Sequence, residues 1–385
     1  MLVEQNISRL NHLLKLYNIS ADELVLYISE GLKTPLTNRD ILSSEIKVNT
    51  LKRIDKFFKK GLNYYLDPKA PIETNESSIF FRKNKFNADL NIGAKKIVNQ
   101  FEELKISLSA ISKLSDIKIE RELPIYSINQ NPKVVALELR EKLYPVFDND
   151  LREFLKNSIS KLAAFNILVF EFVETWNKKE RANIDGFYLN PNVIVLKRHQ
   201  NSFRREIFTL AHELGHYLLN EEEIEQLELS NFSNNNLTSV ERWCNDFAYH
   251  FLVGELDVEI EKINSANSIN DYYYEKINFI SNQTHISKIA LYTRLLYLNK
   301  ISQKDYNLIK ADFEEKFQKM QENKLKQKES DKLMGIKRGG SVPKPINSPL
   351  LISTLQTAYY EGVLSEFEFC KSLNIQSDKL SGYLI

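Results

Sequence analysis

Hydrophobic residues recur along the chain at two different spacings, which predict a mostly helical protein with a small sheet. Val-, Ile- and Phe-rich runs in "NILVFEFV", "FYLN" and "NVIVLKR" predict three strands between residues 166 and 198. Helical spacing follows at about 201–219 and 240–253. Strands followed by helices predict an α+β domain in which the sheet packs against the helix of 201–219.

The first 66 residues predict a small helical domain. Apolar residues at Ile7, Leu10, Leu14 and Tyr17 lie on one helical face. The stretch "LKRIDKFFKKGLNYYL", residues 51–66, predicts one amphipathic helix with a lysine-rich face. Short helices, tight turns and a basic face are compatible with a helix-turn-helix domain that binds DNA. The alternative is a solvated helix whose lysines maintain solubility.

Changes in composition predict five segments. They are a helix-turn-helix-like domain at 1–66, a helical connecting region at 67–149, the α+β domain at 150–315, a charged linker at 316–346 and a helical C-terminal segment at 347–385. In the last segment, Ser365 followed by Glu368 predicts a capping box at the start of a helix.

The overall composition is that of a water-soluble globular protein, with 43% hydrophobic and 27% charged residues. A net charge of +1 argues against a globally basic nucleic-acid binder. There is no apolar run of the roughly 18 residues that a membrane span needs, and no secretory signal is visible. Cys244 and Cys370 are too few for a disulfide scaffold. We therefore expect a cytoplasmic protein with no membrane association.

The strongest chemical signal is "FTLAHELGHYLL", residues 208–219, an apolar helix that carries three titratable groups. His212 and His216 are four residues apart, so they lie nearly above one another and can offer two imidazole nitrogens to one metal ion. Glu213 lies about 100° around the helix, too far to join the pair but able to reach a water on the metal. This H-E-x-x-H pattern is typical of zinc peptidases, with Glu213 as the catalytic base.

A catalytic zinc ion takes three protein ligands, and we predict Glu241 as the third. It lies at the margin of the apolar face of the helix in "SVERWCNDFAYHFLV". His250 lies about 180° around that helix and cannot share the face. The competing interpretation is that Glu241 closes a capping box with Thr238. The acids of the preceding loop are interpreted as a solvated run.

Catalysis also needs a donor for the developing oxyanion, and a metal-bound histidine needs an orienting partner. The candidates near the motifs in the sequence are Asn245, Tyr217, Tyr249 and Arg242. Their spacing in the sequence does not indicate which of the four has either role.

"RREIFTLAHELGHYLL" followed by "SVERWCNDFAYHFLV" resembles the ImmA/IrrE family of zinc metallopeptidases. The second motif carries the family pattern E-x-x-x-N-x-F-A at Glu241, Asn245, Phe247 and Ala248, and "IDGFYLNPNVIVLKR" resembles the strand pair upstream. The resemblance implies one Zn²⁺ per chain, held by His212, His216 and Glu241, with Glu213 as the base. Gly254 stands where the family often has proline.

The resemblance further implies an N-terminal helix-turn-helix domain and a narrow protein substrate. That substrate is expected to be a helix-turn-helix transcriptional repressor, whose cleavage controls stress, mobile-element or toxin–antitoxin genes. The alternative is a DNA-binding transcriptional regulator that uses the metallopeptidase-like fold as a sensor or interaction module.

Overall fold

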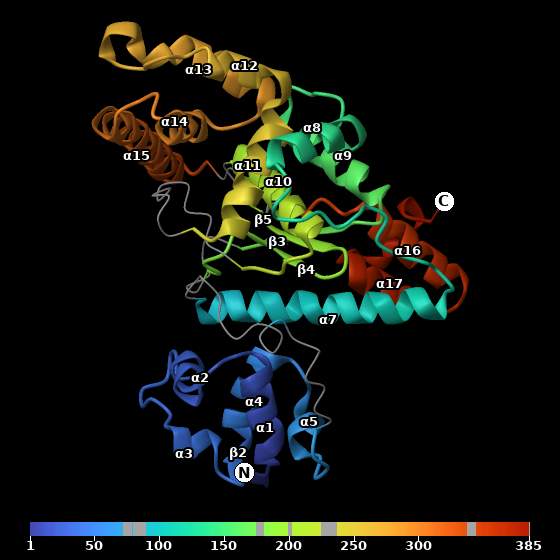
Figure 1. Cartoon of the computed structure of the whole chain (residues 1–385). Helices are drawn as coiled ribbons and strands as arrows, with labels where there is room; N and C mark the ends of the chain where they lie inside the picture. The colour runs from blue at the N-terminus through green and yellow to red at the C-terminus, as the bar shows by residue number, and fades with distance from the viewer. Residues whose placement is uncertain are drawn as a thin grey trace. The chain divides into compact units, whose positions relative to one another are not determined.

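The computed structural model describes residues 1–71, 79, 90–174, 181–198, 202–224, 237–336 and 344–384 (Figure 1). The chain divides into two compact units. The first comprises Met1–Ala110 with Lys178–Ile184, and the second comprises Ile111–Asn177 with Asp185–Ile385.

The first unit is a small helical body with a two-stranded antiparallel sheet. Its strands are β1 (Leu2–Glu4) and β2 (Glu45–Lys47). Its helices are α1 (Ile7–Leu16), α2 (Ala21–Ile28), α3 (Asn38–Ile41), α4 (Val48–Phe58), α5 (Leu62–Leu66) and most of α7 (Ile92–Leu114). Leu10, Leu13, Leu24, Ile54 and Phe57 lie in its core. Leu10, Leu14 and Tyr17 of the expected helical stripe lie in this core, whereas Ile7, which begins α1, is half-buried.

The single helix predicted over residues 51–66 is wrong, because the chain breaks it between α4 and α5. Lys59 has φ +55° and Gly61 has φ +83°, and neither value belongs to a right-handed helix. Lys52, Lys56 and Lys59 are exposed, whereas Lys60 pairs with Glu103 at 2.5 Å. The helices are short, as expected, but their assignment as a helix-turn-helix domain stays a prediction.

The second unit contains a three-stranded sheet in the order β3-β5-β4. β3 (Leu168–Val173) pairs with β5 (Val193–Arg198) in parallel, with Leu168 opposite Val193. β4 (Gly186–Leu189) pairs with β5 in antiparallel, and the two strands are joined by a turn that contains the cis peptide Asn190–Pro191. The three predicted strands are thus confirmed.

Helices cover one face of this sheet. α10 (Phe203–Leu219) packs against β4 and β5, and α9 (Leu151–Ala163) packs against β3 (Figure 1). α11 (Ser239–Val253) packs against α10 and against α8 (Pro132–Leu143). The expected α+β fold, mostly helical with a small sheet packed on the H-E-x-x-H helix, is confirmed.

The remaining elements extend this unit toward the C-terminus. They are α12 (Asp257–Glu261), α13 (Tyr274–Thr284), α14 (Lys288–Tyr297), α15 (Gln303–Leu333), α16 (Pro349–Tyr360), α17 (Glu366–Leu373) and three short 3₁₀ helices, η1 (Gly254–Leu256), η2 (Ser268–Tyr273) and η3 (Ser377–Gly382). Ser365 and Glu368 form the expected capping box.

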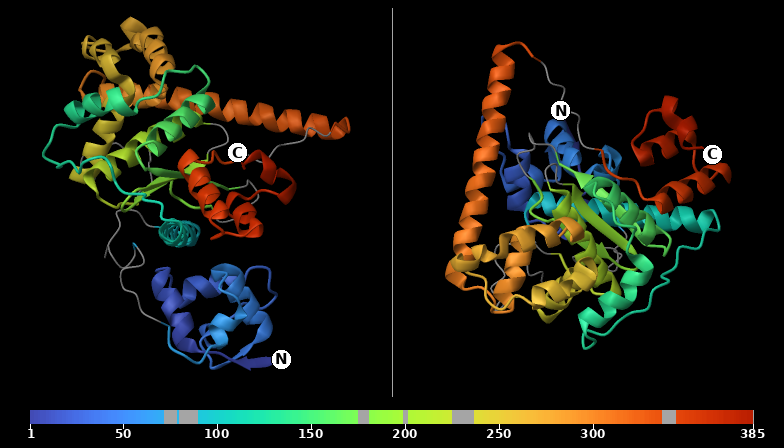
Figure 2. Two further views of the ribbon diagram at one scale, coloured as in Figure 1. Left: turned by 90° about the vertical axis from the view of Figure 1, so that its right-hand side faces the viewer. Right: turned by 90° about the horizontal axis from the view of Figure 1, so that it is seen from above.

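Two of the predicted segment boundaries differ from the structure. Helix α8, placed in the connecting region 67–149, contributes Val135, Leu139 and Leu143 to the core of the second unit. Helix α15 runs to Leu333, well into the predicted linker 316–346 (Figure 2). Residues 337–343 of that linker lie outside the described residues. No helix in the described part of the chain is long and apolar enough to cross a membrane.

A buried ion pair joins the sheet to the first turn of α10. Nη1 of Arg198, at the end of β5, donates to both carboxylate oxygens of Glu206 at 2.7 and 2.8 Å. The two side chains are 7% and 0% exposed. Because breaking a buried pair leaves an uncompensated charge in a low-dielectric interior, this contact fixes the start of α10 against β5.

Replacing Arg198 with leucine is expected to lower the free energy of unfolding by about 3–5 kcal/mol, because Glu206 is then buried without its cation. Urea unfolding followed by circular dichroism measures the change. Lys161→Leu removes an exposed charge of the same unit and serves as the control, with an expected change below about 1 kcal/mol. Equal stability of the two variants would contradict the prediction.

Candidate metal centre

Helix α10 carries two imidazoles to one point. The Nε2 atoms of His212 and His216 are 3.1 Å apart, and each residue is 1% exposed. The proximity follows from the four-residue spacing on a helix, which places the two rings on the same face one turn apart. The helix itself is long enough to hold them rigidly, since it extends from Phe203 to Leu219.

Helix α11 adds a carboxylate to this pair. Oε2 of Glu241 lies 3.2 Å from Nε2 of His212, and Oε1 lies 3.0 Å from Nε2 of His216. The three donor atoms all lie within 4.8 Å of one another. Ligands about 2.0–2.1 Å from a tetrahedral ion are roughly 3.3 Å apart, so these separations match three ligands of one ion.

The surroundings of Glu241 also fit a bound cation. The residue is 0% exposed, and apart from the two imidazoles neither carboxylate oxygen has a hydrogen-bond partner among the described residues. Burial raises the pKa of Glu241, but the charges and hydrogen bonds of His212 and His216 outweigh it and hold that pKa well below its ordinary value. A buried carboxylate is costly without a positive partner, and a divalent metal ion supplies one.

Asn245, one turn after Glu241 on α11, orients the first histidine. Its Oδ1 lies 3.1 Å from Nδ1 of His212. An Nδ1–H that donates to this oxygen leaves the lone pair of Nε2 directed at the metal position, which fixes both the tautomer and the ring orientation. The structure therefore places Asn245 against a predicted ligand.

The close crossing of α10 and α11 depends on the glycine within the H-E-L-G-H motif. A Cβ on Gly215 would lie 3.1 Å from Cα, Cβ and Sγ of Cys244 on α11. This distance is tighter than an ordinary carbon contact. The missing side chain lets the two helices approach closely enough for Glu241 to reach the histidines. The place of Gly215 between the two histidines was a signal for this role, which the metal-ligand pattern alone did not predict.

A second glycine makes room for Glu213. A Cβ on Gly186, in strand β4, would lie 3.2 Å from Cγ of Glu213 and 2.6 Å from Cγ2 of Thr209. Glu213 is 4% exposed and lies against this strand, outside the cluster of three metal-ligand atoms. That arrangement matches the geometry expected of a base that flanks the metal without binding it.

Thr238 begins α11 and sets the position of Glu241. Its Oγ1 accepts a hydrogen bond from the backbone N of Glu241 at 3.1 Å. Only this half of a capping box is present, because the carboxylate of Glu241 faces the histidines instead of the Thr238 backbone. Glu241 can therefore take part in helix capping through its backbone N and in metal ligation through its carboxylate.

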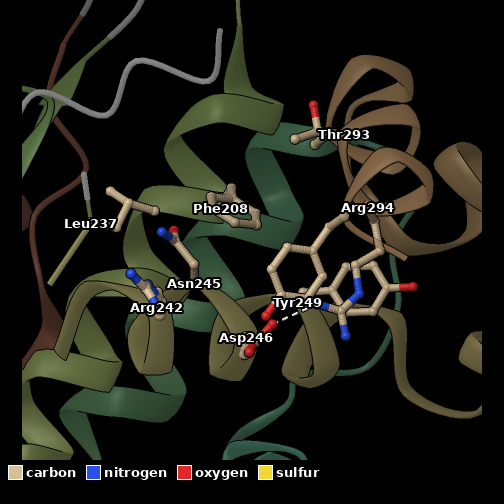
Figure 3. Close-up of a pocket in the computed structure, with 10 residues that line it drawn as sticks. Phe208, Leu237, Arg242, Asn245, Asp246, Tyr249, Thr293 and Arg294 are labelled. Carbon is tan, nitrogen blue, oxygen red and sulfur yellow. Dashed lines mark hydrogen bonds and ion pairs between the residues drawn. The ribbon is translucent and has the colours of Figure 1, made fainter. Parts of the chain in front are cut away.

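The other three candidates lie in different surroundings. The ring of Tyr217 packs against Tyr188 and under Arg121, whose guanidinium carbon is 3.8 Å from the ring centre. Tyr249 donates from its hydroxyl to Asp257 at 2.9 Å, and burial raises its pKa. Arg242 is exposed and lines the same pocket as Asn245 (Figure 3).

Two histidines and a glutamate on packed helices, with a second glutamate beside the first histidine, define a metallopeptidase-like site. Residues 163–296 match the family model of the IrrE N-terminal-like domain, Peptidase_M78. This part of the chain is therefore similar to the ImmA/IrrE family that the sequence motifs predict. A search of curated proteins found no match, and neither did a search of solved structures.

One departure from the family pattern has a structural reason. Gly254, which ends α11 at the position where the family resemblance leads to an expectation of proline, has φ +55°. Proline is held near −65° and cannot adopt that value. A Cβ here would also lie 2.7 Å from Nε of Arg140. Glycine therefore suits this helix end.

Replacing Glu241 with glutamine is expected to lower the affinity for a divalent transition metal by at least about 100-fold, since removal of a ligand exceeds the 10–100-fold effect of losing an outer partner. Competition with a coloured chelator measures the affinity, and elemental analysis measures the metal content. Glu255→Gln, at an exposed glutamate just beyond α11, is the control and should bind metal normally. An unchanged affinity of Glu241→Gln for the metal would show that Glu241 is not a ligand.

Replacing Gly215 with alanine is expected to separate α10 from α11 and to destabilise the unit by about 1–3 kcal/mol through overpacking. The affinity for metal should fall as well, because the separation moves Glu241 away from the histidines. Thermal unfolding with and without metal measures both effects. Gly382→Ala, where a Cβ meets no atom within 4 Å, is the control. Normal stability and normal metal affinity of the Gly215→Ala protein would show that the metal site does not require this close approach of α10 and α11.

Proposed function

We propose that the chain is a cytoplasmic zinc-dependent endopeptidase. His212, His216 and Glu241 hold one Zn²⁺, and Glu213 is the catalytic base. The observation that carries the proposal is the convergence of two imidazole nitrogens and one carboxylate, with separations of 3.0–3.2 Å. Two nitrogens and one oxygen form the ligand set of zinc peptidases, which leave a further position open for catalysis.

In this proposal the reaction is hydrolysis of a peptide bond. A zinc ion at the site supplies a Lewis acid that activates water and polarises a carbonyl group. Glu213 accepts the proton of the attacking water and delivers it to the leaving amine. Gly186 leaves the room that this carboxylate needs beside β4, and Asn245 holds the ring of His212 in place.

The enclosure of the site supports narrow specificity. His212, His216, Glu213 and Glu241 are each at most 4% exposed. Few polypeptides can bring a peptide bond to such a site, and hydrolysis there proceeds away from bulk water. We propose that the substrate is a helix-turn-helix transcriptional repressor and that its cleavage controls stress, mobile-element or toxin–antitoxin genes, as the family resemblance implies.

Replacing Glu213 with glutamine is expected to retain one zinc ion per chain while lowering cleavage by about 10²–10⁴-fold, because the amide cannot accept the proton. The measurement incubates zinc-loaded protein with a panel of helix-turn-helix repressors and identifies products by mass spectrometry. Glu221→Gln, at an exposed glutamate just after α10, is the matched control.

Cleavage by Glu213→Gln at the wild-type rate would contradict the proposed role of this residue. Full control of gene expression in cells by the same variant would favour the alternative function, a DNA-binding regulator. In that case binding to promoter DNA through residues 1–66 should weaken steeply with salt.

A further inference from the structure

A pocket opens between α10, α11 and α14, all of which belong to the second unit (Figure 3). Its walls include Phe208 from α10, Asn245 and Tyr249 from α11, and Ala290, Thr293 and Arg294 from α14. The proposed catalytic reaction does not use this pocket.

The pocket lies one helical turn from the metal ligands. Phe208 precedes His212 by four residues on α10, and Asn245 follows Glu241 by four residues on α11. Four residues correspond to about 6 Å along a helix axis. Asn245 also lines the pocket while its Oδ1 contacts His212 at 3.1 Å. A polypeptide with its scissile bond at the metal therefore has a neighbouring side chain within reach of the pocket.

Apart from Arg242, the polar residues of the walls each have a partner. Asp246 and Arg294 form an ion pair of 2.5 Å, which Figure 3 marks with a dashed line. Thr293 donates to the carbonyl of Ile289 at 2.8 Å. Tyr249 and Asn245 are engaged with Asp257 and His212. The surfaces left for a bound group are the ring of Phe208, the methyl of Ala290 and the aromatic face of Tyr249. These surfaces favour an apolar group.

The size of the pocket fits one side chain. Its volume is about 70 Å³. A single water requires roughly 10–15 Å³ by this measure, so there is room for about five to seven water-sized groups. Leucine, isoleucine, methionine and phenylalanine side chains have that size, whereas a helix is far too large.

We propose that this pocket binds one large apolar side chain of the protein substrate and thereby sets where the chain is cut. The inference rests on the proposed peptidase function and adds to it the kind of residue that is recognised. Arg242 lies beside the pocket with an exposed side chain that makes no hydrogen bond or ion pair among the described residues. Its guanidinium is available to donate to a carbonyl of the bound peptide.

The first experiment measures binding without cleavage. Zinc-loaded Glu213→Gln protein, labelled on alanine and threonine methyl groups, is titrated with N-acetyl-leucine amide and with N-acetyl-glycine amide, which differ only in the side chain. We expect saturable shifts of the Ala290 and Thr293 methyl signals with the leucine compound and none with glycine. Equal shifts, or no saturable shift with leucine, would overturn the proposal.

The second experiment fills the pocket. Ala290→Phe should block leucine binding, read from the Thr293 methyl group. In a peptide library cut by otherwise wild-type enzyme, the variant should lower cleavage next to large apolar residues by roughly 10- to 200-fold relative to small ones. Ala311→Phe, the same change at an exposed position of α15, is the control.

The two experiments separate the two proposals. Leucine binding without any cleavage by the wild-type enzyme would support the pocket and reject the peptidase function. Cleavage with no preference for an apolar residue at any fixed position, unchanged in Ala290→Phe, would support the peptidase function and reject the pocket. If Ala290→Phe fails to fold, the comparison of leucine with glycine in the protein without that substitution still decides.

Discussion

The structure of the second unit depends on a carboxylate that is buried against two imidazoles. Glu241 has no exposed surface, and among the described residues its carboxylate contacts only the imidazoles of His212 and His216. A charge removed from water in this way is tolerated only with a positive partner. The stability of the crossing between α10 and α11 therefore depends on a cation beside the buried carboxylate of Glu241.

The residues around the Glu241 carboxylate bring α10 and α11 close together. Gly215 removes the side chain that would separate α10 from Cys244 of α11. The Arg198–Glu206 pair fixes the first turn of α10 to the sheet, and Thr238 fixes the first turn of α11. Each contact acts at a helix end or crossing, which are the points where a small displacement changes the separation of the donor atoms.

Local features of this fold were predictable from the sequence. The i, i+4 spacing of His212 and His216 acts within a single helix, and the position of Glu241 follows from the apolar face of its own helix. The helices predicted over 201–219 and 240–253 agree with α10 and α11 within a few residues. The pocket and the close approaches of Gly186 and Gly215 involve separate elements and were not predicted.

Two errors have identifiable causes. The apolar period continues across Lys59 and Gly61, so it concealed the break between α4 and α5. The charged stretch 316–333 has no apolar stripe, so it was interpreted as the trailing end of a helix and assigned to the linker. It is the rest of α15, and the i, i+4 ion pairs Asp312–Lys316 and Glu315–Lys319 at the assigned boundary support an exposed helix. Asn245 contacts His212 and also lines the pocket. A substitution that reshapes this wall of the pocket therefore also disturbs His212. Among the described residues, the opposite wall on α14 (Ala290, Thr293 and Arg294) makes no hydrogen bond or ion pair to His212, His216 or Glu241, so its shape can change without moving a metal ligand.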